Sequence, residues 1–272
     1  MNTRGSLVRS DLIRRCLMGC GVVALLVVGQ APAAVAQNAG CRIAGGRSVD
    51  RLAVNPAGDL ETPGGETWTP AGIVVADPSK PGLADAQRSL LAAFAASGPF
   101  RISAVAGRPD RWGRMPALIG REGSGDHLAA ALARAGLAVA KAGDLPAGCA
   151  AAVLAAEAEA RTARRGLWLD GEAHLSAEAP AAILEHVGRY VVVEGRVLGA
   201  TERKTKAYLN FDEVWSEDFT VTVSKRTLNR LEASGMRWST LKGRRVRVRG
   251  VVMDSGGPLI EASAPEDIER LD

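Results

Sequence analysis

The sequence predicts a mainly β fold that combines β-barrel strands with helices, in two successive parts. In the first half, residues 83–97, 127–143 and 146–168 place leucine and alanine at helical spacing. The second half is dense in short segments rich in valine and threonine, which are typical of strands. A polar stretch at 169–180, "LDGEAHLSAEAP", separates the two halves.

Residues 1–36 read as a secretory signal peptide. Arg14 and Arg15 precede an apolar run at 16–28, and small residues lie just before position 37. The run is shorter than the roughly 20 residues that a spanning helix needs. We therefore expect an exported protein, periplasmic or secreted, with no stable membrane span after cleavage of the signal. An uncleaved anchor is the alternative.

The charge of the chain excludes one broad class of function. The 272 residues carry a formal net charge of +4, and residues 1–36 supply most of it through four arginines and one aspartate. The remainder holds 30 basic and 29 acidic side chains. A polycation that binds nucleic acid through its overall charge is therefore excluded, and any basic site must be local.

Export would also determine which cysteines remain in the mature chain and whether they can form a disulfide. Cys16 and Cys20 lie in the signal, which leaves Cys41 and Cys149 in the exported chain. An even number of cysteines in an oxidising compartment favours a bridge. Closing so long a loop would contribute up to about 4–5 kcal/mol in the chain-entropy model. We expect a Cys41–Cys149 disulfide, with two unlinked thiols as the alternative.

Four segments of the first half occur in an informative order. They are "TPAGI" at 69–73, "PDRWGRMPALI" at 109–119, "HLAAALARAGLAVA" at 127–140 and "LAAEAEARTARRGLW" at 154–168. In this order, the residues from about 45 to 168 resemble a staphylococcal-nuclease-type (thermonuclease) domain. The resemblance implies a five-stranded barrel with three helices over 37–170, and calcium-dependent hydrolysis of phosphodiester bonds in DNA or RNA.

The implied reaction explains which side chains matter. Phosphodiester hydrolysis places extra negative charge on the phosphate oxygens in the transition state. Such enzymes use carboxylates that hold a hard cation, a carboxylate that activates water, and arginines whose planar fork grips two oxygens. By the resemblance, Arg114 matches a catalytic arginine and Asp77 lies near the water-activating carboxylate. Asp59 or Glu61 would be the ligand of Ca²⁺.

Two positions depart from the family pattern. Thr69 stands where a second catalytic arginine is expected, and Val74 stands where a metal ligand is expected. Losing one preorganised donor costs roughly 10²–10³ in rate, and losing a hard ligand weakens the cation site. A degenerate site is therefore predicted, in which Arg114 remains to bind phosphate. The alternative is that Arg114 forms a surface pair with Asp110.

Arg111 and Trp112 are further candidates for contact with nucleic acid, because they belong to the same "DRWGR" stretch as Arg114. An exposed aromatic side chain here would stack on a base. For Trp112 we favour packing over the mouth of the barrel, with stacking as the alternative.

The second half predicts a small closed barrel of the oligonucleotide-binding (OB) type over 183–272. The strand-like segments lie at 189–200, 207–211, 218–224, 244–253 and 258–265. A helix-like insert at 225–235 lies between the third and the fourth, and five strands with one late helix are typical of this barrel. The likeness to OB domains is looser than the first resemblance.

Three arginines in this half form a candidate nucleic-acid contact. Strand alternation places Arg245, Arg247 and Arg249 on one face at a spacing of about 6–7 Å, close to the stride of phosphates along an extended strand. Aromatic residues that could add stacking faces are Tyr208, Phe211, Trp215 and Phe219. The alternative is a solvated face whose arginines pair with acids, namely Glu194, Glu213, Glu217 or Asp218.

Three functions remain open at this point. The first is an exported protein with a degenerate phosphodiesterase site that binds nucleic acid or another partner. The second is an active calcium-dependent nuclease. The third is a structural module that binds a protein partner in the cell envelope.

Overall fold

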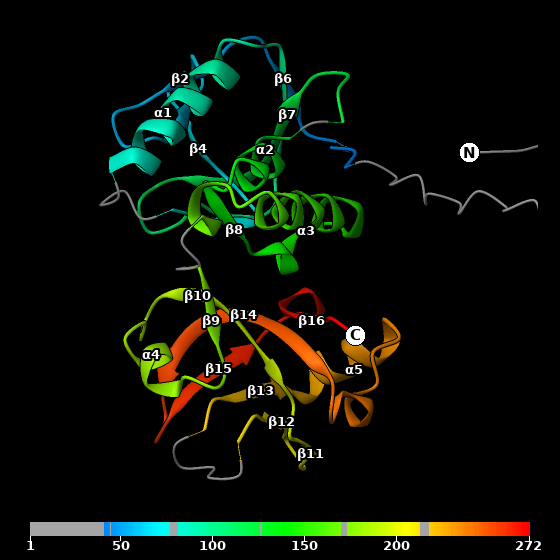
Figure 1. Cartoon of the computed structure of the whole chain (residues 1–272). Coiled ribbons are helices and arrows are strands. Elements are labelled where there is room, and N and C mark those ends of the chain that lie inside the picture. The colour runs from blue at the N-terminus through cyan, green and yellow to red at the C-terminus, as the bar shows by residue number, and fades with distance from the viewer. Residues whose placement is uncertain (1–40, 44, 77–80, 126, 170–172, 213–217) are drawn as a thin grey trace, which may run out of the picture. The chain divides into compact units, whose positions relative to one another are not determined.

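The computed structural model describes residues 41–43, 45–76, 81–125, 127–169, 173–212 and 218–272. By its internal contacts the chain divides into two units, 1–36 and 37–272, and every described residue belongs to the second. The predicted class, mainly β-sheet with helices, is confirmed (Figure 1).

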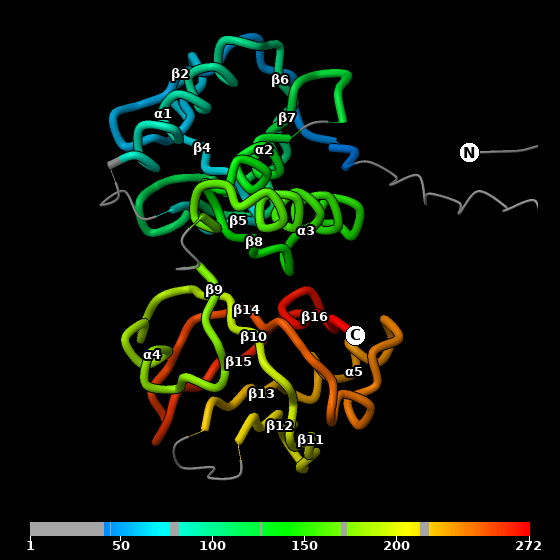
Figure 2. The backbone as a smooth tube through the Cα atoms, viewed as in Figure 1, coloured from blue at the N-terminus to red at the C-terminus, as the bar shows by residue number. Residues whose placement is uncertain are grey.

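The first sheet has the strand order β1-β6-β7-β4-β3-β2. Its strands are β1 (Arg47–Val49), β2 (Ala53–Val54), β3 (Leu60–Glu61), β4 (Thr67–Pro70), β6 (Phe100–Ala104) and β7 (Met115–Arg121). A separate pair consists of β5 (Ile73–Val75) and β8 (Ala138–Ala140), which lie side by side in Figure 2. The sheet buries Leu60, Phe100 and Ile102 in one apolar cluster with Leu91 of the first helix.

Three helices accompany these strands: α1 (Pro81–Ala95), α2 (Leu128–Arg134) and α3 (Ala147–Thr162). The predicted helix at 127–143 is wrong in its second half, because α2 ends at Arg134 and β8 follows. Gly136 causes the change: its φ is +71°, and a Cβ there would lie 2.1 Å from the carbonyl oxygen of Arg165. Glycine alone adopts this conformation without strain and permits this approach of backbone to backbone.

The apolar stretch at 67–76, "TWTPAGIVVA", forms two strands. Gly72, with φ +85°, separates β4 from β5, and a Cβ at this position would lie 2.3 Å from the Leu145 side chain. The chain therefore leaves the first sheet after β4 and pairs with β8.

The predicted disulfide is confirmed, because Cys41 and Cys149 are bonded. Both are buried, at 2% and 1% exposed. The bond joins the segment before β1 to the first turn of α3 and lies within an apolar cluster that also contains Ala133 and Val153.

The strands of the second half form a sheet with the order β11-β12-β13-β15-β14-β10-β9, and β16 pairs with β14. The strands are β9 (His174–Ser176), β10 (Tyr190–Arg196), β11 (Gly199–Glu202), β12 (Lys206–Asn210), β13 (Thr220–Ser224), β14 (Arg245–Asp254), β15 (Pro258–Ala262) and β16 (Ile268–Arg270). Since β10 runs almost directly into β11, one continuous stretch of chain pairs with β14 at one end and with β12 at the other. The sheet therefore curls around a core of buried valines, leucines and Trp238.

The second half also contains α4 (Pro180–Leu184), α5 (Lys225–Ala233) and the short 3₁₀ turns η3 (Trp238–Leu241) and η4 (Pro265–Asp267). The 3₁₀ turns η1 (Ala142–Asp144) and η2 (Gly166–Trp168) belong to the first half. Helix α5 occupies the predicted position between the third and fourth strands, and its first turn is capped by Ser224, whose Oγ accepts a hydrogen bond from the Thr227 amide. None of the helices in the described ranges has the length and apolar character needed to cross a bilayer.

A buried carboxylate on α3 connects the two sequence halves. Glu157 is 0% exposed; one of its oxygens accepts a hydrogen bond from the Ala140 amide at 2.6 Å, and the other pairs with Arg249 of β14 at 3.0 Å. The Tyr190 hydroxyl of β10 donates to the Ala140 carbonyl at 3.3 Å. Apolar contacts add to this junction, since Val139 and Val192 belong to one cluster with Trp168. The domain boundaries predicted at 170 and 183 stay predictions.

The Glu157→Ala substitution is expected to lower the free energy of unfolding by about 3 kcal/mol, because it leaves the buried Arg249 guanidinium with less charge compensation. Glu159→Ala is the matched control on the same helix: Glu159 pairs with Arg134 at an exposed position and should change stability by less than about 1 kcal/mol. Urea unfolding of both variants provides the measurement. Equal effects would show that Glu157 is not a structural anchor.

Candidate functional site

The "DRWGR" stretch forms a tight turn that places Arg114 at the start of β7. One carboxylate oxygen of Asp110 accepts hydrogen bonds from the amides of Trp112 at 2.9 Å and Arg114 at 3.0 Å. Gly113 supplies the positive φ that the turn requires, at +78°. The aspartate and the glycine of this sequence therefore fix the backbone, and the turn sets the direction of the two arginines and the tryptophan.

The Arg114 guanidinium is held between two aspartates. Its Nε donates to Asp110 at 2.9 Å, and its Nη1 donates to Asp59 at 3.2 Å across 55 residues of sequence. Asp59 is 8% exposed, whereas the Arg114 side chain is 29% exposed, so this contact lies at the edge of the surface. Burial alone would lower the pKa of Arg114, but the hydrogen bonds and charges of Asp110 and Asp59 raise it above its ordinary value.

Trp112 is the exposed part of this site. It is 63% exposed, which differs from the favoured expectation that it packs over the barrel. The guanidinium carbon of Arg111 lies 3.9 Å from the centroid of the indole, and that of Arg114 lies 4.8 Å from it. Both distances are in the range of cation–π contact. The indole and the two arginines thus form one surface group, which we call the tryptophan–arginine turn (Arg111, Trp112 and Arg114).

Among the other positions implied by the resemblance, the structure describes Thr69, Val74 and Glu61. Thr69 lies on β4 beside Pro116, and Val74 lies on β5 beside Val139. Glu61 accepts a hydrogen bond from Asn55 at 3.0 Å, and Asp77 lies outside the described residues. In the part of the chain that the structure describes, no group of three or more His, Cys, Asp or Glu residues is placed to hold a metal ion.

The three arginines that were predicted to form a row on β14 differ strongly in their exposure to solvent. The side chain of Arg245 is 55% exposed, that of Arg247 11%, and that of Arg249 1%. The row is therefore not a continuous exposed face, and Arg249 is buried against Glu157 and unable to reach a nucleic acid at the surface. The reason is that Glu157 of α3 and Glu269 of β16 lie against the Arg249 guanidinium, which strand alternation does not reveal.

These arginines form ion pairs with carboxylates, as the alternative prediction for β14 expected. Glu194 lies 2.5 Å from Arg247 and 3.6 Å from Arg245. Glu269 lies 2.8 Å from Arg247 and 3.3 Å from Arg249. The expected partner Glu194 is present, whereas Glu157 and Glu269 were missed because each comes from an element outside the strand pattern.

The charge of Glu194 is strongly stabilised. The hydrogen bond with His174, whose Nε2 lies 3.3 Å away, and the guanidinium of Arg247 lower the pKa of Glu194 to about 2 against its burial. This cluster of Glu194, His174 and Arg247 holds β9, β10 and β14 together and leaves little charge for an external ligand.

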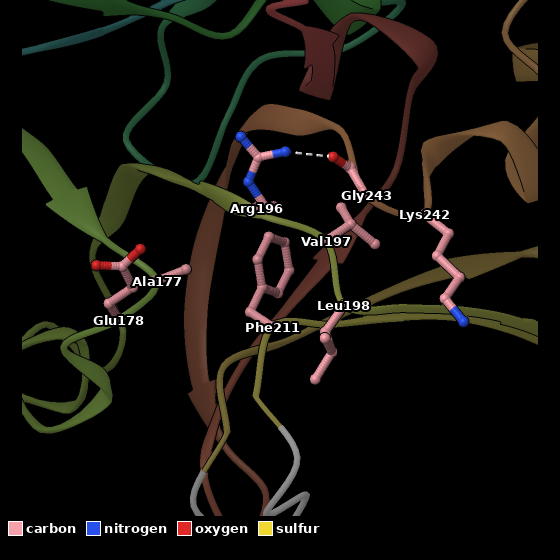
Figure 3. Close-up of a pocket in the computed structure, with 8 residues that line it drawn as sticks. All are labelled: Ala177, Glu178, Arg196, Val197, Leu198, Phe211, Lys242 and Gly243. Atoms are coloured by element: carbon pink, nitrogen blue, oxygen red, sulfur yellow. Dashed lines mark hydrogen bonds between the residues drawn. The ribbon is translucent and has the colours of Figure 1, made fainter.

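Of the aromatic candidates, Phe211 lies at a small pocket in the second half, shown in Figure 3. The pocket has a volume of about 270 Å³ and is lined by Ala177, Glu178, Arg196, Val197, Leu198, Phe211, Lys242 and Gly243. The Arg196 guanidinium donates to the Gly243 carbonyl at 2.6 Å. Phe219 is buried beside Phe211, Tyr208 is half-buried on β12, and Trp215 lies outside the described residues.

Glu194 predicts a loss of stability in acid. Because its pKa in the folded state is about 2, against an ordinary 4.5, its contribution is complete above pH 4.5 and is lost as the pH falls through about 2. Between these values the wild type should lose about 2 kcal/mol more than Glu194→Gln. Urea midpoints across this range measure the difference, with the exposed Glu178→Gln as control. Parallel curves for wild type and Glu194→Gln would contradict the assignment.

Comparison with known proteins adds no family to these observations, because no family model and no curated protein matches this chain.

Proposed function

We propose that this chain is an exported, thermonuclease-like protein that binds single-stranded nucleic acid at the tryptophan–arginine turn without cleaving it efficiently. The observation that carries the proposal is the exposed indole of Trp112, with the Arg111 guanidinium carbon 3.9 Å from its centroid. The resemblance of "PDRWGRMPALI" to the thermonuclease pattern supports the same position.

The binding part of the proposal rests on exposure and charge. An exposed aromatic ring flanked by guanidinium groups is a stacking platform for bases, and such stacking is worth about 1–3 kcal/mol per base. The loop before β7 carries Arg108 and Arg111, whereas Asp110 and Asp59 compensate the charge of Arg114. In the proposed complex, Arg108 and Arg111 contact phosphates on either side of a base stacked on Trp112.

The proposed loss of cleavage follows from the partner of Asp59 and from the residues at positions 69 and 74. A nuclease of this type needs carboxylates that hold a cation, but Asp59 contacts the Arg114 guanidinium. Val74 offers no ligand atom, and Thr69 offers no second guanidinium for the transition state. Each missing donor costs roughly 10²–10³ in rate, so the proposed site retains phosphate binding and loses most of its catalytic power.

The two alternative functions, an active nuclease and a structural module, require different properties of the protein. An active calcium-dependent nuclease would require that Asp59 or Glu61 holds the cation and that Asp77 activates the attacking water. A structural module of the cell envelope would have no affinity for nucleic acid and would bind a protein partner through another surface. The next two experiments separate the three.

Trp112→Ala should weaken binding of a fluorescent single-stranded DNA by about tenfold, since it removes one stacking face. Arg111→Ala should weaken it less, and should reduce the slope of log affinity against log salt by about 0.7, the value for one lost phosphate contact. Arg88→Ala on α1, an exposed arginine paired with Asp85, is the matched control and should behave as wild type. Absence of binding, or a slope of zero, would favour the structural module.

Cleavage of plasmid and single-stranded DNA in the presence of calcium should not exceed that of Arg114→Ala purified in parallel. The shared background would then represent contaminating nuclease. Rapid calcium-dependent cleavage that disappears in Arg114→Ala would instead establish an active nuclease.

A further inference from the structure

A basic surface lies in the second half, where helix α5 begins beside the turn between β11 and β12 (Figure 1). The amide of Lys225, the first residue of α5, donates a hydrogen bond to the Thr205 carbonyl at 3.3 Å. The Lys225 ammonium pairs with Glu202 at 3.0 Å across the same junction. The start of α5 and the tip of the β11–β12 turn are therefore neighbours.

Four cationic side chains define this surface. Arg226 and Arg230 lie one turn apart on α5, and Arg203 and Lys204 lie in the β11–β12 turn. All four are exposed, and none forms an ion pair with a carboxylate in the part of the chain that the structure describes. We call these four residues the basic end (Arg203, Lys204, Arg226 and Arg230).

The described acids nearest the basic end do not neutralise it. Glu202 and Glu261 each pair with a lysine, at 3.0 Å and 2.9 Å. Glu232 of α5 is rotated about the helix axis by about 120° or more from both arginines of the helix. The positive charge of the four side chains therefore remains available to an external anion.

The undescribed acids adjoin other elements. Residues 213–217 include two glutamates and are connected to the end of the β12–β13 pair where Asn210 lies beside Thr220. Helix α5 follows the opposite end, where Lys206 lies beside Ser224, about 14 Å away at 3.4 Å per residue. The other undescribed segments adjoin β1, β5, α1, α2, η2 and β9, whereas α5 packs chiefly against β12, β13, η3 and η4.

The cations at the start of α5 are unfavourable for the helix itself. A helix N-terminus carries positive partial charge, so acids are preferred in the first turn. This turn has no acid and begins with Lys225 and Arg226. Glu202 compensates Lys225, whereas Arg226 gains no ion pair from the described chain. A local cost without a local gain is typical of a residue that serves binding.

The side chains around the basic end favour a contact made by charge alone. The apolar face of α5 is buried in the barrel through Leu228 and Leu231, so it is not available to insert into a bilayer. Residues 199–206 and 225–233 contain no aromatic side chain on which a base could stack. Clusters of about 4–8 lysines and arginines on an amphipathic helix are typical of binding to anionic lipid headgroups.

We propose that the basic end attaches the protein to an anionic phospholipid surface, through contacts of its guanidinium and ammonium groups with lipid phosphates. The proposal goes beyond nucleic-acid binding and is independent of it, because the tryptophan–arginine turn takes no part. Each cation near an anionic leaflet contributes about fivefold in affinity. The attachment is therefore sensitive to salt and involves no insertion.

Sedimentation of the full chain with two kinds of vesicle tests the proposal. One kind contains phosphatidylcholine alone, and the other contains phosphatidylcholine and phosphatidylglycerol in equal amounts. The measured quantity is the ratio of the affinity for anionic vesicles to that for neutral vesicles. Residues 1–36 are present in the wild type and in every variant, so a difference in this ratio between proteins arises elsewhere in the chain.

Two double variants, on two separate elements, remove the charge. Arg226→Gln with Arg230→Gln should lower the ratio at least about tenfold, and Arg203→Gln with Lys204→Gln should lower it similarly. Higher salt should lower the ratio of the wild type toward that of the variants.

Two control variants should keep the ratio of the wild type. Arg42→Gln with Arg51→Gln removes two exposed cations from the first half and matches the double variants in net charge. Trp112→Ala changes the tryptophan–arginine turn, so failure of the proposed nucleic-acid site would leave this result unaffected.

Three results would contradict the proposal. No preference of the wild type for anionic vesicles would reject the lipid surface, even if a variant fails to fold. An unchanged ratio in both double variants, with the thermal midpoint preserved, would place the contact elsewhere. Loss of affinity for a DNA duplex in these variants, with the vesicle ratio unchanged, would assign the basic end to nucleic acid instead.

Discussion

The buried carboxylate of Glu157 is the interaction on which the arrangement of the described chain depends. It accepts a hydrogen bond from the Ala140 amide on one side and from the Arg249 guanidinium on the other, and neither partner has access to water. A charge buried this deeply is stable only while its partners stay in place. β8, α3 and β14 are therefore held in register with one another.

Charge compensation also governs the candidate site. Arg114 occupies the position where a phosphate-binding arginine is expected, and its two nearest acids compensate it directly. The same principle operates on β14, where Glu194 and Glu269 compensate Arg247. Nearly every arginine that the sequence pattern singles out is paired in this way. Arg111, which lies over the exposed Trp112, is the clearest exception among the described candidates.

Local patterns predicted the elements well, and long-range packing explains what they missed. The spacing of leucine and alanine predicted α1 and α3, and the alternation at 244–253 predicted β14. The same spacing predicted a helix that continues beyond the observed end of α2. The positive φ at Gly136 ends the helix, although leucine and alanine continue along the sequence. The expectation of export and the cysteine count sufficed to predict the disulfide, since Cys41 and Cys149 allow one pairing.

The sequence indicated which residues belong to the candidate site, but only part of how their side chains are arranged. The "DRWGR" stretch identified Arg111, Trp112 and Arg114, but the contact with Asp59 depends on a residue 55 positions away. Likewise, alternation placed Arg249 on the face of Arg245 and Arg247, while Glu157, 92 positions earlier in the sequence, decides that it is buried. A strand pattern specifies which side chains share a face, and tertiary packing determines what covers that face.

A calcium titration tests most directly whether the acids near Arg114 serve the arginine or a cation. The account predicts no saturable calcium binding by the wild type, and the same trace for Asp59→Asn. Saturable binding that is lost in Asp59→Asn would show that this carboxylate holds a cation, and would contradict the central claim.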